Sequence, residues 1–125
     1  MASSQVERGQ CPIVAAIRVV GNESKLTVIR YLTKNGMGFN ELKRISGMNA
    51  KTLSSALRSL EAEGIVNRQV VSTRPFKVSY TLTQKGLDLR PALEILGEWA
   101  SRWLLNGTGE GISPQAQLNS SLQSD

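Results

Sequence analysis

The sequence predicts a mainly α-helical fold of the α+β class that contains one small antiparallel β-hairpin. Apolar residues recur at helical spacing in several separate stretches between residues 11 and 106. Only residues 65–82 change to a spacing of about two, and Pro75 lies within that stretch. Two of the helical stretches are joined by a tight connection at Gly47. We therefore expect helices before and after a single two-stranded sheet.

The composition narrows the classes of function. The chain has 125 residues and a formal net charge of +5, and residues 40–80 hold seven of its cations against three acids. A basic surplus of this kind fits a polyanionic partner. The chain contains no histidine and a single cysteine, so we expect no enzyme activity, no metal site and no cofactor.

Length and hydropathy predict one soluble domain. We expect this domain over residues 11–106, between a flexible N-terminus at 1–10 and a flexible tail at 107–125 that is rich in Gly, Ser, Gln and Asn. The chain lacks an apolar run long enough to span a bilayer, and it lacks a signal-peptide pattern. The expected location is therefore the cytoplasm, with no membrane partner.

The first expected helix is unusually hydrophobic. It opens at Cys11 and Pro12, with proline at the favoured first position, and runs to Gly21. Its other residues are apolar except for Arg18. Such a helix has to be covered on several sides, either by the core of the domain or by another subunit.

The next two expected helices are more polar. One begins at Asn22 or Ser24 and ends near Lys34, and the other is capped by Asn40 and ends at Gly47. The residues that we expect to face the core are Leu26, Ile29 and Leu32 in the first, and Leu42 and Ile45 in the second. The second also carries two cations on its outer side, Lys43 and Arg44.

Residues 49–63 predict an amphipathic helix with a distinctive outer face. Asn49 can cap its N-terminus, and Gly64 suits the left-handed residue that ends a helix. Its apolar stripe consists of Leu53, Ala56, Leu57 and Leu60. The opposite face carries small hydroxyls and cations, namely Lys51, Ser55 and Arg58, with Thr52, Ser54 and Ser59 at its flanks. Small side chains permit close approach, and cations can reach phosphates or base edges; an ordinary solvated face is the alternative.

The elements before and after this helix indicate a winged helix-turn-helix. A tight turn at 46–48 makes it the second helix of a helix-turn-helix, the position that enters a DNA groove. After it we expect strands at 65–71 and 78–82 around a turn at 72–77. The proline of the turn cannot donate a ladder hydrogen bond, and the cations Arg74 and Lys77 flank it. A hairpin in this position is a wing; a plain surface hairpin is the alternative.

The last expected helix runs from Thr83 to about Asn106, and Pro91 should kink it or split off a short first segment. Its apolar stripe consists of Leu89, Leu93, Leu96, Trp99, Ala100 and Trp103. Two tryptophans one turn apart exceed the needs of so small a core. We expect them to be buried against a second copy, with packing on the first helix of the same chain as the alternative.

Five short motifs can be compared with known families. They are CPI at 11–13, GMNAKTL at 47–53, LRSLEAEGIV at 57–66, PFKVSY at 75–80 and LTQKG at 82–86. In this order and spacing they resemble the HxlR-type family of bacterial and archaeal winged-helix regulators, within the MarR-like superfamily. The resemblance covers residues 11 to about 103.

This resemblance implies a homodimeric transcriptional regulator that binds double-stranded operator DNA, with the N- and C-terminal helices at the subunit interface. The expected interface residues are Ile13, Ile17, Leu96, Trp99 and Trp103. The expected DNA-binding residues are Lys43, Arg44, Asn49, Lys51, Thr52, Ser55, Arg58, Arg74 and Lys77. The sequence identifies no effector. A winged-helix module for protein–protein assembly, without specific DNA binding, is the alternative function.

Cys11 is a candidate for redox sensing. By resemblance, some members of the family use a cysteine in this Cys-Pro context to sense oxidants or electrophiles. At a helix N-terminus, the unpaired N–H groups and the helix dipole favour a thiolate. The alternative is that Cys11 is a small buried apolar residue.

Overall fold

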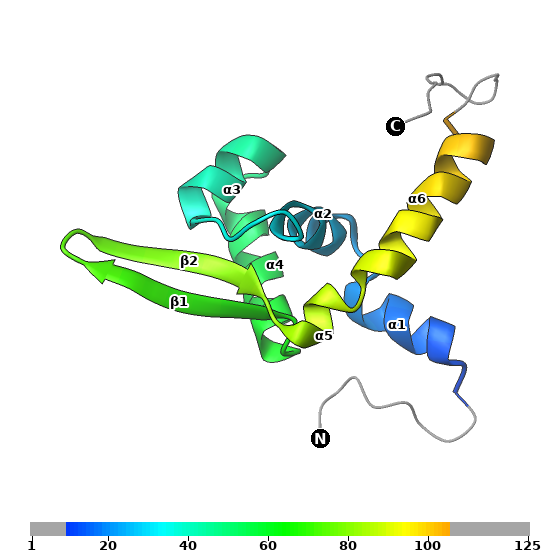
Figure 1. Cartoon of the computed structure of the whole chain (residues 1–125), viewed down its shortest axis with the longest axis horizontal. Coiled ribbons are helices and arrows are strands. Elements are labelled where there is room, and N and C mark those ends of the chain that lie inside the picture. The colour runs from blue at the N-terminus through cyan, green and yellow to red at the C-terminus, as the bar shows by residue number, and fades with distance from the viewer. Residues whose placement is uncertain (1–9, 106–125) are drawn as a thin grey trace. The chain divides into compact units, whose positions relative to one another are not determined.

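The computed structural model describes residues 10–105, and the chain divides between Leu87 and Asp88 into two compact units. The first unit contains α1 (Pro12–Val20), α2 (Glu23–Leu32), α3 (Phe39–Ser46), α4 (Ala50–Ala62), β1 (Val66–Thr73), β2 (Phe76–Leu82) and α5 (Gln84–Leu87) (Figure 1). The second contains α6 (Arg90–Trp103). The mainly helical fold with one antiparallel hairpin is confirmed. The two ends that we expected to be flexible lie, apart from Gln10, outside the described residues.

The core of the first unit forms where α2, α3, α4 and the start of β1 pack together. The expected apolar stripe of α4 is buried along its whole length. The largest fully buried side chains of the described residues are Val28, Ile29, Leu42, Leu53, Leu60 and Ile65. Truncation of such a side chain to alanine typically costs about 2–5 kcal/mol, so these contacts fix the orientation of α4.

Two positions in the core differ from expectation. Val28 is buried whereas Leu26 is only partly buried, so the inward face of α2 is rotated relative to the expected one. Ile45 is 42% exposed. Helix α3 begins at Phe39 with Gly38 as its cap, rather than after a cap by Asn40. Leu42 is the buried residue of α3, and Ile45, in the last turn, is turned toward solvent.

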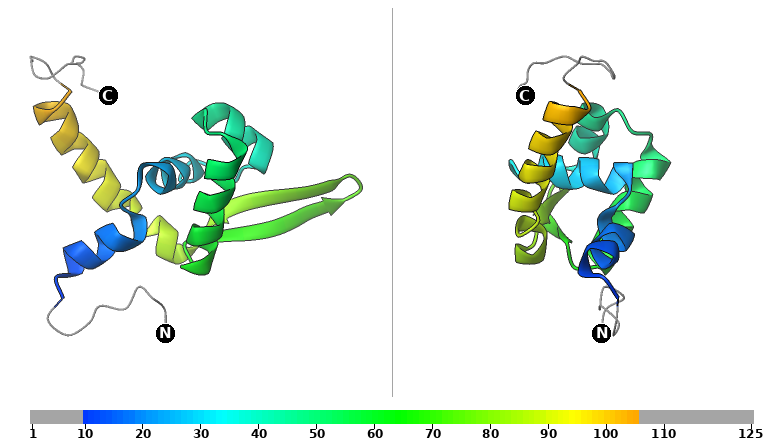
Figure 2. Two further views of the ribbon diagram at one scale, coloured as in Figure 1. Left: turned by 180° about the vertical axis from the view of Figure 1, so that it is seen from behind. Right: turned by 90° about the vertical axis from the view of Figure 1, so that its right-hand side faces the viewer.

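The hairpin is longer than the sequence suggested. We expected a turn at 72–77, but only Arg74 and Pro75, which are joined by a cis peptide bond, separate the strands. The expectation was wrong because the residues next to the turn find partners: Ser72 pairs with Lys77, and Thr73 with Phe76. Figures 1 and 2 show the hairpin extending well beyond the helices of the first unit.

The base of the hairpin is anchored on a second side. Met37, between α2 and α3, forms an isolated bridge with Tyr80. The Met37 N–H donates to the Tyr80 carbonyl at 3.0 Å, and the Tyr80 N–H donates to the Met37 carbonyl at 2.7 Å. The base of β2 therefore has hydrogen-bonded neighbours on both edges, whereas the distal part of the hairpin has two strands only.

The last helical region is split at the proline. Helix α5 is a single turn, in which the Gly86 N–H donates to the Thr83 hydroxyl at 3.2 Å. Helix α6 starts after it, with Pro91 in its first turn, where a missing N–H is tolerated. We expected Pro91 either to kink the last helix or to split off a short first segment, and the structure shows the split. No residue of α6 is buried.

Candidate nucleic-acid interface

A three-residue connection joins α3 to α4. Gly47 ends α3 in the left-handed conformation, with φ of 76°, and its N–H donates to the Lys43 carbonyl at 3.0 Å. An L-residue with a side chain rarely adopts this φ, so glycine is the residue that suits the turn. Asn49 then caps α4, because its Oδ1 accepts the Thr52 N–H at 2.8 Å. This confirms the expected helix-turn-helix geometry.

Helix α4 ends as sharply as it begins. Gly64 has φ of 74°, its N–H donates to the Glu61 carbonyl at 3.0 Å, and the Ile65 N–H donates to the Leu60 carbonyl at 2.9 Å. These two bonds form a Schellman motif, which satisfies carbonyls at the end of the helix. The helix is therefore fixed at both termini, and its exposed face keeps a constant direction.

The exposed face of α4 carries the side chains that the sequence indicated. Lys51, Ser55 and Arg58 are exposed, and Thr52 is partly exposed. Asn49 is also exposed, but its side-chain oxygen is already used for the cap, which leaves its amide N–H groups for other contacts. The structure thus brings five of the expected DNA-binding residues onto one helix.

An open cleft of about 450 Å³ lies between this face and the start of α2. Its lining residues are Asn22, Ser24, Lys25, Lys51, Thr52, Ser55, Ala56 and Ser59. The lining combines hydroxyls with two lysines, groups that donate hydrogen bonds to oxyanions such as phosphate. Asn22 caps α2 by accepting the Lys25 N–H at 3.0 Å, and the Lys25 ammonium donates to the Val19 carbonyl at 3.1 Å.

The α2 side of this cleft was missed by the sequence analysis. Asn22 and Ser24 were recognised there only as candidate helix starts, and Lys25 was given no role. Their position beside α4 depends on how two helices pack, and no local pattern in the sequence reports that packing.

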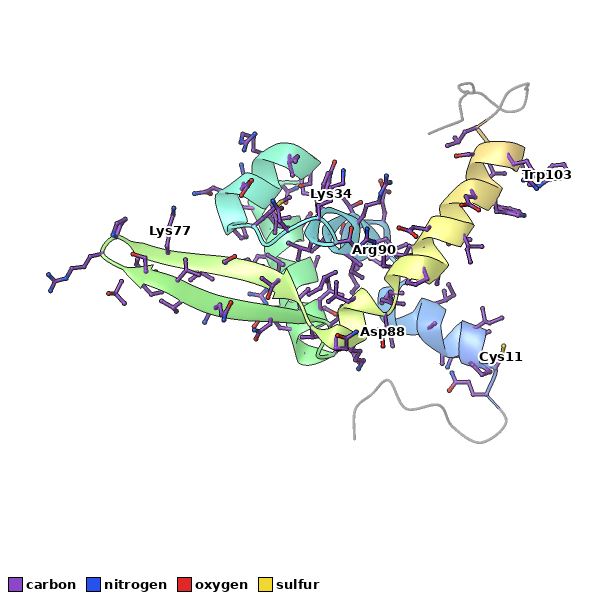
Figure 3. The ribbon with its side chains drawn as sticks, in the orientation of Figure 1. Cys11, Lys34, Lys77, Asp88, Arg90 and Trp103 are labelled. Carbon is purple, nitrogen blue, oxygen red and sulfur yellow. The ribbon has the colours of Figure 1, made fainter. Side chains whose placement is uncertain are left out.

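The remaining cations lie on α3 and on the hairpin. Lys43 and Arg44, in the last turn of α3, are both exposed. Arg74 lies in the hairpin turn and Lys77 just after it, and both are exposed. Figure 3 shows the Lys77 side chain projecting away from the ribbon near the end of the hairpin. Residues 66–82 contain three cations and no Asp or Glu, so the hairpin is uniformly basic.

Helices α1 and α6 each expose apolar side chains. On α1, Ile13 is 72% exposed and Ile17 is 57% exposed. On α6, Leu96, Trp99 and Trp103 are 55%, 54% and 66% exposed. Cys11, at the N-cap of α1, is also exposed (Figure 3). Exposed apolar side chains in such numbers are typical of interaction surfaces, so α1 and α6 are each a candidate for one.

Neither a metal site nor a membrane-spanning helix is found among residues 10–105. In this part of the chain no group of three or more Cys, Asp or Glu residues is placed to hold a metal ion. No helix within it is both long and apolar enough to cross a bilayer.

The sequence matches a known family model. A model described as HxlR-like helix-turn-helix matches residues 19–108, which is more than half of the chain. The chain belongs to the HxlR-like helix-turn-helix family. This is a family of transcriptional regulators, and the resemblance that the motifs indicated is confirmed.

Individual HxlR-like and related proteins support this assignment. YtcD of Bacillus subtilis, an HTH-type transcriptional regulator, is 31% identical over 116 residues, which cover 90% of this chain and 92% of YtcD. The reduced form of YodB from B. subtilis superposes with a TM-score of 0.70 at 31% identity, over 80% of this chain and 98% of YodB. The oxidised form of the redox regulator HypR gives a TM-score of 0.68 at 34% identity, over 74% and 96%. The chain therefore has the winged-helix fold of this family.

Proposed function

We propose that this HxlR-like regulator is a homodimer that binds specific sequences in double-stranded DNA. In each subunit the segment 49–63, which contains α4 and its cap Asn49, would enter a major groove. The observation that carries this proposal is the division of α4 into a fully buried apolar stripe and an exposed face of hydroxyls and cations. Lys51 and Arg58 are long enough to reach base edges or phosphates, and Ser55 between them permits close approach.

Other groups of the first unit would bind the DNA backbone. The cleft between α2 and α4 offers Ser24, Thr52 and two lysines to a phosphate that follows the groove occupied by α4. Lys43 and Arg44 on α3 would contact flanking phosphates. Arg74 and Lys77 on the hairpin would contact the backbone or the adjacent minor groove. Such contacts fix the register of the protein on the duplex, and the base contacts of α4 select the sequence.

Dimerisation would cover the exposed apolar side chains of α1 and α6. A soluble monomer rarely leaves several isoleucine and tryptophan side chains more than half exposed. A two-fold dimer would present two copies of α4 to half-sites about one helical turn apart, so the operator should be an inverted repeat. Such a regulator would act in the cytoplasm.

The experiment that tests this proposal is selection of bound duplexes from a random pool, followed by a titration of the selected duplex at several salt concentrations. We expect an inverted repeat and an affinity that falls linearly with the logarithm of salt concentration. Absence of binding at micromolar protein and low salt would contradict DNA binding. That result would favour the alternative, a winged-helix module for protein–protein assembly.

A second function, thiol sensing by Cys11, is supported by two observations. The thiol is exposed at the N-cap of α1, a helix whose apolar side chains we place in the subunit interface. HypR is a redox regulator, and YodB has been solved in reduced, diamide-treated and quinone-bound forms. Modification of Cys11 would then alter the interface and, through it, the spacing of the two copies of α4.

A further inference from the structure

One face of the hairpin carries most of its apolar side chains, from its base to its turn. Residues of β2 alternate regularly, so Phe76, Val78 and Tyr80 lie on the same side of the sheet. Residues that pair directly across two strands also share a side. The apolar wing face, defined by these two rules, consists of Val66, Arg68, Val70, Thr73, Phe76, Val78, Tyr80 and Leu82.

The other face of the hairpin has the opposite character. Its cross-strand pairs are Asn67 with Thr81, Gln69 with Ser79, and Ser72 with Lys77. Every side chain in these pairs is polar or charged. Val71, which the ladder skips at a bulge between Val70 and Ser72, is 56% exposed and belongs to none of these pairs. On either side of this bulge the paired residues keep the two faces distinct, although only the base of the hairpin packs on the core.

Burial decreases steeply along the apolar wing face. Val66, at the base, is 3% exposed, whereas Val70 is 52% exposed and Phe76 is 67% exposed. A hairpin end that served only as a solvated surface would gain nothing from a phenylalanine in that position. The apolar wing face thus continues past the part that the core covers, and its outer end is available for a partner.

The charge around this outer end indicates the kind of partner. Arg74 and Lys77 lie on either side of Phe76 in the sequence, and Arg68 lies further back on the same face. The hairpin has no carboxylate to oppose them. Lys77 projects from the polar face, so the end of the hairpin is basic on the side away from the ring as well. An apolar ring at a basic hairpin end matches a nucleic-acid groove, in which sugars and base edges lie between two rows of phosphates.

We propose that Phe76 is an apolar wedge that enters the DNA minor groove next to the major groove occupied by α4. Its ring contacts sugars and base edges, while Arg74 and Lys77 contact the phosphates on either side. Apolar wedges partly unstack a base step, and this is easiest at flexible pyrimidine–purine steps such as TA or CA. Phe76 therefore selects such a step outside the bases that α4 reads. This inference rests on the proposed DNA binding.

The test compares three variants of the full chain on a duplex selected by the wild-type protein. Phe76→Ala should weaken binding by about 5- to 150-fold, the range found when a base-stacking aromatic is removed, with the salt slope unchanged. Lys77→Ala should instead flatten the salt slope by about one phosphate contact. Gln69→Ala, an exposed position on the polar face of the same hairpin, is the control and should bind as the wild type does.

A fluorescent base analogue placed at the step next to the hairpin supplies a direct readout. Its emission should rise when the wild-type protein binds, because unstacking relieves quenching, and it should stay low with Phe76→Ala. Equal affinity and equal emission for Phe76→Ala and wild type would overturn the proposal. Dissociation of the Phe76→Ala dimer in sedimentation velocity would also overturn it, because the ring would then cover a second copy or another protein surface. If the wild type binds no duplex, DNA binding itself fails, and this inference fails with it.

Discussion

The hydroxyl oxygen of Thr83 lies 2.5 Å from the backbone carbonyl oxygen of Gly64, just after the end of α4. The Thr83 N–H also donates to the Ile65 carbonyl at 3.0 Å, and the Thr83 hydroxyl accepts the Gly86 N–H. One threonine thus joins the end of α4 to the start of α5. The segment that leaves the hairpin is thereby tied to the helix that precedes it.

We expect Thr83→Val to lower the free energy of unfolding by about 1–3 kcal/mol, because the Gly64 carbonyl and the Gly86 N–H both lose a partner. Thr83→Ser keeps the hydroxyl and should remain within about 0.5 kcal/mol of the wild type. Denaturant unfolding monitored by circular dichroism measures both. A valine variant as stable as the serine variant would show that the hydroxyl contributes no stability.

Helix α4 was predictable because its signals are local. Asn49, the four apolar residues of its stripe and Gly64 all lie within sixteen consecutive positions, and each acts on its neighbours along the chain. Cap, buried face and left-handed end are all present in the structure. The exposed residues of α4 then followed from helical geometry alone.

Features that depend on distant packing were not predictable in the same way. The hairpin turn was placed at 72–77 from its polar residues, yet cross-strand pairing extends the ladder to Thr73 and Phe76. The outward position of Ile45 depends on how α3 rotates against the core. The cleft combines Ser24 with residues of α4, about thirty positions later, so no sequence pattern could indicate it.

Replacement of Arg58 on the exposed face of α4 should weaken binding to the selected operator. If its guanidinium pairs with a guanine, Arg58→Ala costs about 1–3 kcal/mol and relaxes the base preference at one position of each half-site. Arg30→Ala removes the same charge from α2, outside both the cleft and the α4 face, and serves as the control. Fluorescence anisotropy on the operator and on single-base variants measures both effects. Equal losses for Arg30 and Arg58 would mean that Arg58 contributes only net charge.

Replacement of Trp103 on α6 should dissociate the proposed dimer. Tryptophans buried at an interface often cost 2 kcal/mol or more when truncated, so Trp103→Ala should raise the dimer dissociation constant at least about 30-fold. Arg102→Ala, which alters the adjacent exposed position, is the control. Sedimentation velocity over a concentration series gives the constants. A wild-type protein that sediments as a monomer at high micromolar concentration would rule out the interface.

Oxidation should act on the protein through Cys11, its single cysteine. A diamide or quinone treatment should change the operator affinity of the wild type and leave Cys11→Ser unaffected. With diamide, loss of two hydrogens from two Cys11 thiols would give one intersubunit disulfide, visible as a dimer on a non-reducing gel; a small thiol could form a mixed disulfide instead. Identical operator binding by treated and untreated wild-type protein would exclude sensing by this residue.

The stability of the hairpin base should depend on pH in the alkaline range. Burial raises the pKa of the Tyr80 phenol above its ordinary value of 10.0, nearby Glu61 raises it further, and Arg68 partly opposes the shift. The phenol therefore ionises first in the unfolded chain. The neutral Tyr80 phenol makes its full contribution to the free energy of unfolding below pH 10. This contribution is lost as the pH rises from 10 through the pKa of Tyr80 in the folded state. Tyr80→Phe should remove this part of the alkaline decline in unfolding free energy, whereas Tyr31→Phe should leave it in place. Denaturant unfolding at intervals between pH 8 and pH 11 measures the difference, and parallel curves for wild type and Tyr80→Phe would contradict the coupling.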